Sequence, residues 1–270
     1  GANSYDGDIT LGSAARINAD AGSLTVGGTV DNGGFLLTVG GAGNTTFEDI
    51  ISGLGGLTKD GAGTTTLEAG NSYSGATTVN AGTLEVTGTI ASAVVTVNNA
   101  ATLEVANGAA ISNTAAVTLN DTSTLALTNS ETIGSLAGAS GSFVTLGANT
   151  LTTGGDNTST SYAGTISGTG ALTKTGTGTF TLTGANSYEG LTSVNAGVLN
   201  VQDADALGTD DAGTTVASGA ALEVQGGITI ATEALTLNGS GVLSGGALRS
   251  VSGANSYDGD ITLGSAARIN

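Results

Sequence analysis

The chain of 270 residues has no cysteine, histidine, proline, methionine or tryptophan, and only five of its residues are lysine or arginine. Without cysteine and histidine, the common zinc sites, cysteine nucleophiles and histidine bases are excluded. Twenty-two acidic residues set the net charge at −17, so no basic surface can follow a phosphate backbone. No apolar run approaches the ~20 residues of a membrane helix. We therefore expect no nucleic-acid partner and no membrane insertion in this segment.

The residues that are present predict a folded chain. Glycine is abundant, with 47 residues, and the 39% apolar content is high for a disordered linker. The mean hydropathy of +0.21 agrees with this expectation. The lack of proline suits a fold in which nearly every backbone N–H joins a β-ladder.

Repetition is the most informative feature of the sequence. Residues 253–270 repeat residues 1–18 letter for letter. We interpret residues 1–252 as one tandem period and residues 253–270 as the start of the next. This predicts identical repeats stacked head to tail in the same chain or filament.

A second repeat lies inside the period. Residues 56–86 align without a gap to residues 171–201, at an offset of 115 residues. The match continues upstream, which gives related modules near 51–86 and 166–201. Nested repetition of this kind is typical of an array or solenoid.

Short alternating segments recur at spacings of 17, 19 and 22 residues, at Thr66-Leu67-Glu68, Thr83-Leu84-Glu85, Thr102-Leu103-Glu104 and Thr124-Leu125-Ala126. Each predicts a strand with leucine on one face and threonine or glutamate on the other. No segment has helical periodicity. We predict an all-β, right-handed parallel β-helix of about 12–13 coils per 252-residue period, with roughly 20 residues per coil.

This arrangement predicts two rows of stacked side chains. Asn80, Asn98 and Asn120 each follow an apolar residue before a strand, and at ~4.8 Å spacing their amides would form a ladder. The alternative is three ordinary turn asparagines. Glu68, Glu85 and Glu104 would form a second, repulsive row, unless loop insertions offset the coils so that the carboxylates never meet.

The repeated modules resemble a known family. Residues 57–84, and with small changes 172–199, read L-T-K-x-G-x-G-T-x-T-L-x-x-x-N-S-Y-x-G-x-T-x-V-N-A-G-x-L. This run resembles the autotransporter-associated β-strand repeat, found in passenger domains of bacterial autotransporters and related giant surface proteins. The resemblance implies a parallel β-helix, export, and a stalk or adhesive role at the bacterial cell surface.

Candidate chemical sites are few. Lys59 and Lys174 occupy the same place in each module, which we interpret as one repeated turn cation. The segment 203–211 carries four aspartates; it could hold Ca²⁺, but its spacing departs from the EF-hand pattern, and a solvated acidic loop is favoured. An ice-binding threonine face would be interrupted by the glutamates. We expect no catalytic, cofactor-binding or metal-binding residues, no cofactor and no enzyme activity.

The predicted function is a structural rod or fibre segment of a very long secreted bacterial surface protein, acting as a stalk, filament or sheath. The alternative is an adhesin module that binds glycans or neighbouring cells through lateral loops. For that role, the tyrosines of the repeated N-S-Y turns, Tyr5, Tyr73, Tyr188 and Tyr257, would be exposed and stack on sugars. Packing within the turn is the simpler explanation for them.

Overall fold

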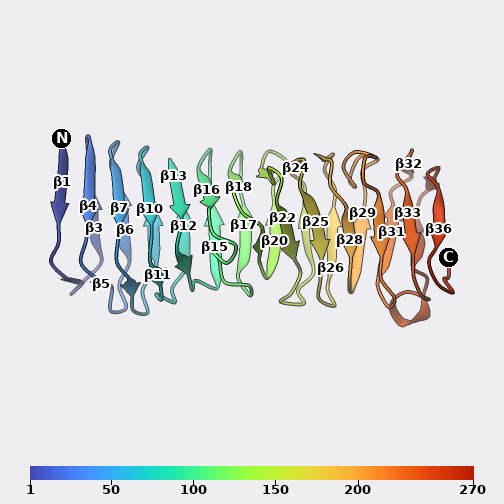
Figure 1. Ribbon diagram of the computed structural model, residues 1–270, viewed down its shortest axis with the longest axis horizontal. Coiled ribbons are helices and arrows are strands. Elements are labelled where there is room, and N and C mark those ends of the chain that lie inside the picture. The colour runs from blue at the N-terminus through green and yellow to red at the C-terminus, as the bar shows by residue number, and fades with distance from the viewer. The chain divides into compact units, whose positions relative to one another are not determined.

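The computed structural model describes all residues, 1–270, and consists of two compact units, Gly1–Thr132 and Ile133–Asn270. Both units are built from short β-strands, and the one helical element is a 3₁₀ turn, η1 (Val242–Ser244). No helix has the length and apolar character needed to cross a membrane. Within each unit the chain winds turn after turn, with strands of successive turns side by side (Figure 1).

The first unit has three strand-bearing sides. One sheet contains β1 (Ala2–Tyr5), β4 (Ser23–Val26), β7 (Asn44–Phe47), β10 (Thr64–Leu67), β13 (Thr83–Val86), β16 (Thr102–Val105) and β18 (Thr124–Leu127). The next contains β3 (Ala15–Asn18), β6 (Leu37–Gly40), β9 (Leu57–Lys59), β12 (Thr77–Val79), β15 (Val94–Val97) and β17 (Ala116–Leu119). The third side has short pieces: β2 (Ile9–Thr10), β5 (Val30–Asp31), β8 (Ile51–Ser52), β11 (Gly70–Asn71), β14 (Thr89–Ile90) and β19 (Glu131–Thr132).

The second unit is built in the same way. One sheet contains β20 (Ser135–Gly138), β23 (Thr160–Tyr162), β26 (Thr179–Leu182), β29 (Val198–Val201), β31 (Ala221–Gln225) and β34 (Leu248–Ser252). Another contains β22 (Thr150–Thr153), β25 (Ala171–Lys174), β28 (Thr192–Val194), β30 (Thr214–Val216), β33 (Leu235–Leu237) and β36 (Ile261–Leu263). The remaining strands are β21 (Phe143–Thr145), β24 (Thr165–Gly168), β27 (Ser187–Tyr188), β32 (Thr229–Ile230) and β35 (Ser256–Tyr257).

Within each unit the paired strands are parallel, and the partner of a paired strand lies one turn away along the chain. The length of a turn varies: Thr64 pairs with Thr83, whereas Leu222 pairs with Leu248 after a longer excursion of the chain. The predicted all-β parallel β-helix is thus confirmed, with about 11 turns against the 12 or 13 expected. Long turns, such as the one that ends at Leu248, account for the difference. The right-handed winding stays a prediction.

The core consists of apolar rows that run from turn to turn. Leu84 pairs with Leu103, and Leu103 pairs with Leu125. All three side chains are buried, and the alternate residues of the same strands are half-buried. Burying one leucine contributes about 1.5–3 kcal/mol, so the leucines at strand spacing supply much of the stability of the stack.

The two related modules have the same local structure. Strands β10 and β26 lie 115 residues apart, as do β13 and β29, and both pairs of strands join in the same register. Leu67 and Leu182 are both fully buried, and so are Leu84 and Leu199. The expected inward direction of these four leucines is confirmed.

The predicted row of three glutamates is wrong at one position. Glu85 lies opposite Glu104, but its neighbour in the preceding turn is Thr66, and Glu104 is followed by Ala126. Alignment by the Thr-Leu-Glu motif would place Thr66 beside Thr83, whereas the strands pair Thr64 with Thr83. This shift by two positions keeps leucine on the inner face and removes Glu68 from the row.

Candidate functional site

The two lysines of the repeated modules lie inside the solenoid. Lys59 is 2% exposed and Lys174 is 1% exposed, so the repeated turn cation is a buried one. Lys174 Nζ donates to the carbonyl oxygens of Thr175 at 2.5 Å, Gly176 at 2.9 Å and Ala196 at 3.2 Å. Burial lowers the pKa of Lys174 to about 8, and the charge of Asp156 opposes this shift. An ammonium held by carbonyls in this way fastens the backbone of two successive turns.

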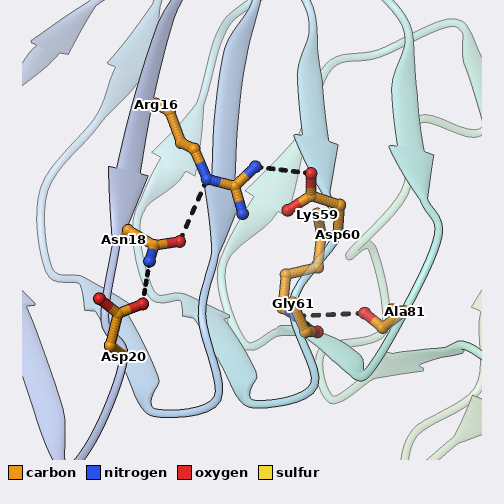
Figure 2. Close-up of polar contacts among 7 residues, drawn as sticks. All are labelled: Arg16, Asn18, Asp20, Lys59, Asp60, Gly61 and Ala81. Carbon is orange, nitrogen blue, oxygen red and sulfur yellow. Dashed lines mark hydrogen bonds and ion pairs between the residues drawn. The ribbon is translucent and has the colours of Figure 1, made fainter.

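Lys59 repeats this arrangement in the first unit. Its Nζ donates to the carbonyl oxygens of Gly61 and Ala81, the latter at 3.1 Å. Figure 2 shows Lys59 beside Gly61, with a dashed line to the carbonyl oxygen of Ala81. Burial lowers the pKa of Lys59, and the charge of Asp60 opposes the shift. Because both lysines are enclosed, neither offers a cation to a ligand.

The tyrosines of the two modules are also core residues. Tyr73 and Tyr188 are fully buried, and their hydroxyls form hydrogen bonds with Thr77 Oγ1 at 2.8 Å and Thr192 Oγ1 at 2.6 Å. Burial raises the pKa of both phenols. The expectation that these two tyrosines are exposed for sugar stacking is therefore wrong, and packing within the turn explains them. Tyr5 is 52% exposed.

Two buried asparagines precede these tyrosines and link successive turns. Asn71 Oδ1 accepts a hydrogen bond from the amide of Ile51 at 2.9 Å, and its Nδ2 donates to the carbonyl oxygen of Thr89 at 3.1 Å. Asn186 Oδ1 likewise accepts from the amide of Ile166 at 2.8 Å. Our sequence reasoning missed this role, although the pairing of Asn with Ser-Tyr at an offset of 115 residues was the available signal.

The asparagine ladder predicted at the corner of the first unit is present. Asn98 Nδ2 donates to Asn80 Oδ1 at 2.8 Å, and Asn120 Nδ2 donates to Asn98 Oδ1 at 2.8 Å. The backbone amides of the three residues bond to the preceding turn as well. Each corner is therefore joined to the next by a main-chain and a side-chain hydrogen bond.

An ion pair spans two turns on the outside of the same unit. Arg16 Nη1 lies 2.7 Å from Asp60 Oδ2, and Arg16 Nε donates to Asn18 Oδ1 at 3.1 Å (Figure 2). The turn between them has Gly40 at this position, where an added Cβ would lie 2.0 Å from Arg16 Nη2. A larger residue at position 40 would displace the flexible end of the Arg16 side chain, because the guanidinium crosses over this glycine.

Glu131 is a buried carboxylate that the sequence did not indicate. It is 1% exposed and accepts hydrogen bonds from the amides of Ala110 at 2.9 Å, Ile111 at 3.4 Å and Thr132 at 3.3 Å. Burial raises its pKa to about 7, and these three hydrogen bonds act against the shift.

A pocket of about 300 Å³ opens beside the acidic segment of the second unit, with Asn186, Asp205, Thr209, Asp210, Thr232 and Glu233 among its lining residues. Glu233 is 5% exposed and accepts a hydrogen bond from Thr214 Oγ1 at 2.7 Å. Burial raises its pKa, and the charge of Asp210 adds to the rise. Carboxyl and hydroxyl groups of Asp205, Asp210, Thr232 and Glu233 are thus among the groups that line this hollow.

The aspartates of segment 203–211 are directed into separate hydrogen bonds. Asp203 accepts from the amide of Asp205, Asp211 from Thr209 Oγ1, and Asp210 from Thr232 Oγ1. Nowhere in the chain do three or more acidic side chains gather in a group that could hold a metal ion. Two of the carboxylates close local turns of their own loop.

Comparison with known proteins identifies the two modules. The passenger-associated-transport-repeat matches residues 57–86 and 172–201. The chain is also similar to the Adhesin BmaC autotransporter of Brucella suis biovar 1 (strain 1330), with 39% identity over 92 residues. That alignment covers 30% of this chain and 3% of the relative, so the chain spans a small part of the relative's length. No solved structure matches the chain.

Proposed function

We propose that this chain is a structural rod segment of a long secreted or cell-surface bacterial protein. The observation that carries the proposal is that the distinctive side chains of the repeat make their contacts within the solenoid itself. Lys174, Asn186 and Tyr188 in the second matched segment are buried and bonded within or between turns, as are their counterparts in the first. Because these side chains hold the turns together, the repeat serves to build length rather than to hold a ligand.

The comparisons support the location of such a rod. The matched repeat is described as passenger-associated, and the similar protein from Brucella suis is named an autotransporter adhesin. We infer export to the cell surface, where the chain holds another part of the protein away from the membrane or forms a filament. A net charge of −17 keeps neighbouring rods apart.

The rod function is tested by contour length. Chains with one, two and three copies of the 252-residue period would be imaged by electron microscopy. At about 11 turns and ~4.8 Å per turn, each period should add roughly 50 Å. Equal lengths for all three chains would contradict the rod. Labelling of intact cells with antibody to this chain tests its location separately.

A second candidate function is an adhesin module, and the pocket beside Glu233 is the observation that favours it. Asp205, Asp210 and the hydroxyl of Thr232 can accept or donate hydrogen bonds to the hydroxyls of a glycan. A glycan array on the parent chain and on Asp210→Asn distinguishes this function from the rod. Signals that the parent gives and the variant loses would establish binding at the pocket.

A further inference from the structure

One turn of the solenoid occurs twice in identical sequence, and the structure places it in two different settings. Residues 1–18 form the first turn of the first unit and pair with β4, β5 and β6 on their downstream side. Residues 253–270 lie in the second unit and pair with β32, β33 and β34 on their upstream side. The two settings show the partners of the same turn on both of its edges.

The backbone groups used in the two settings do not overlap. On the upstream side, the amide donors include Ser256, Asp258, Gly264, Arg268 and Asn270, which correspond to positions 4, 6, 12, 16 and 18 of the turn. On the downstream side, amide donors are Ile9, Leu11 and Ala15. Even positions face one neighbour and odd positions face the other, as alternation along a strand requires. One copy of the turn can therefore make both sets of hydrogen bonds at once.

The apolar residues of the turn also match on both sides. Tyr257 pairs with Ile230, and the equivalent Tyr5 pairs with Val26. Ile269 bridges to Leu248, and the equivalent Ile17 pairs with Val39.

Exposure differs between the two settings of the turn. Leu263 is 57% exposed in the second unit, whereas its counterpart Leu11 is 6% exposed beneath the next turn. Joining the two settings would cover the apolar surface that each leaves open.

We propose that the turn 1–18 is the junction between two successive copies of this chain. One edge of the turn stacks on β32–β34 of the preceding copy, and its other edge stacks on β4–β6 of its own copy. The partner is a second copy of the chain, and the sequence identity fixes the register, because Ser4 takes the place of Ser256 opposite Thr229. The inference rests on the proposed rod function, since only successive periods bring two copies together.

Position 7 of the turn gives a selective test. In the first unit, the three atoms nearest to a Cβ on Gly7 all belong to the exposed Tyr5 side chain, at 3.0–3.4 Å, and this side chain can move aside. In the second unit, a Cβ on the equivalent Gly259 would lie 1.9 Å from the carbonyl oxygen of Glu233. Alanine at this position is therefore compatible with the downstream neighbour and incompatible with the upstream seat. Gly34, with open space around its Cβ position, provides a matched control.

The experiment uses the full chain extended by a second copy of residues 19–270, which makes residues 253–270 the junction turn. Residue-resolved hydrogen exchange should show both even and odd amides of that turn protected. Even amides of the first turn, Ser4 and Asp6, should exchange at least about tenfold faster than their junction counterparts. Gly259→Ala should speed the even junction amides by a similar factor, while Gly7→Ala and Gly34→Ala leave them unchanged.

The proposal would be overturned if the even amides of the junction turn exchanged as fast as those of the first turn. This comparison needs only the extended chain without substitutions. Slow exchange that Gly259→Ala leaves unchanged would also overturn the proposed seat. The rod function is judged separately by contour length. A two-period chain of the expected length with an unprotected junction would refute the stacked junction and leave the rod intact.

Discussion

Lys59 and Lys174, which are 115 residues apart, bury their ammonium groups in the same place of two equivalent modules and donate to the carbonyls of Ala81 and Ala196 in the following turn. A buried charge is costly unless hydrogen bonds compensate for it. Here main-chain carbonyls from two turns offset part of that cost, and the lowered pKa of Lys174 shows that the rest remains. Each lysine therefore acts as an internal fastener between turns of the solenoid.

Replacing Lys174 by methionine should lower the free energy of unfolding at pH 7 by about 1–3 kcal/mol, because three carbonyls lose their donor. Lys59→Met should have a similar effect. The folded pKa of Lys174 is lowered from 10.5 to about 8, so the folded chain binds fewer protons between these values. Stability should then rise with pH in that window, and less so in Lys174→Met.

Urea unfolding at pH 7.5 and pH 10 measures both effects on the lysines. A Lys174→Met chain with the parent's stability and the parent's pH dependence would show that the ammonium does not fasten the turns.

Asn98 occupies the middle of its ladder and Asn120 its end. Asn98→Ala removes two side-chain hydrogen bonds, one to Asn80 and one from Asn120, whereas Asn120→Ala removes the bond to Asn98. At about 0.5–1.5 kcal/mol per bond, Asn98→Ala should be the more damaging substitution by roughly that amount. Urea unfolding of the two single variants gives the comparison, and equal losses would argue against a continuous ladder.

These results show which features the sequence determines. The leucine spacing predicted the fold, and the asparagines that follow an apolar residue before a strand predicted the ladder, because strand alternation and stacking act locally. The exact register between strands of successive turns was not predicted, as Glu68 shows, because loop lengths set the offset between turns. The burial of Lys59 and Glu131 was not predicted either, because hydrogen-bond partners in neighbouring turns hold these polar side chains inside.

Glu131 should make the stability of the first unit depend on pH near neutrality. Its pKa is raised from 4.5 to about 7 in the folded chain, so the folded state binds more protons than the unfolded state between these values. The stabilisation is fully present below pH 4.5 and is lost as the pH rises through about 7. Glu131→Gln, which cannot titrate, should flatten this part of the profile.

The Glu131 profile is measured by urea unfolding at intervals from pH 4.5 to 8. Exposed Glu189 provides the control, because Glu189→Gln should retain the parent's slope between pH 5 and 7. If Glu131→Gln keeps that slope as well, the buried carboxyl is not its source.

The glutamate pair at Glu85 and Glu104 should destabilise the first unit at low ionic strength. The two residues face each other across adjacent parallel strands, and like charges at ~4.8 Å repel by roughly 1 kcal/mol even in water. Thr66 Oγ1 donates to Glu85 Oε2 at 2.9 Å, so Glu104 is the better residue to replace without losing a hydrogen bond. Glu104→Gln should raise the melting temperature, and added salt should raise that of the parent more than that of the variant.

Glu68→Gln is the matched control, because Glu68 follows the end of β10 and lies outside the pair. Thermal melts at two salt concentrations distinguish a local repulsion from an effect of net charge. If Glu68→Gln raised the melting temperature as much as Glu104→Gln, net charge, and not the register of β13 and β16, would set the repulsion.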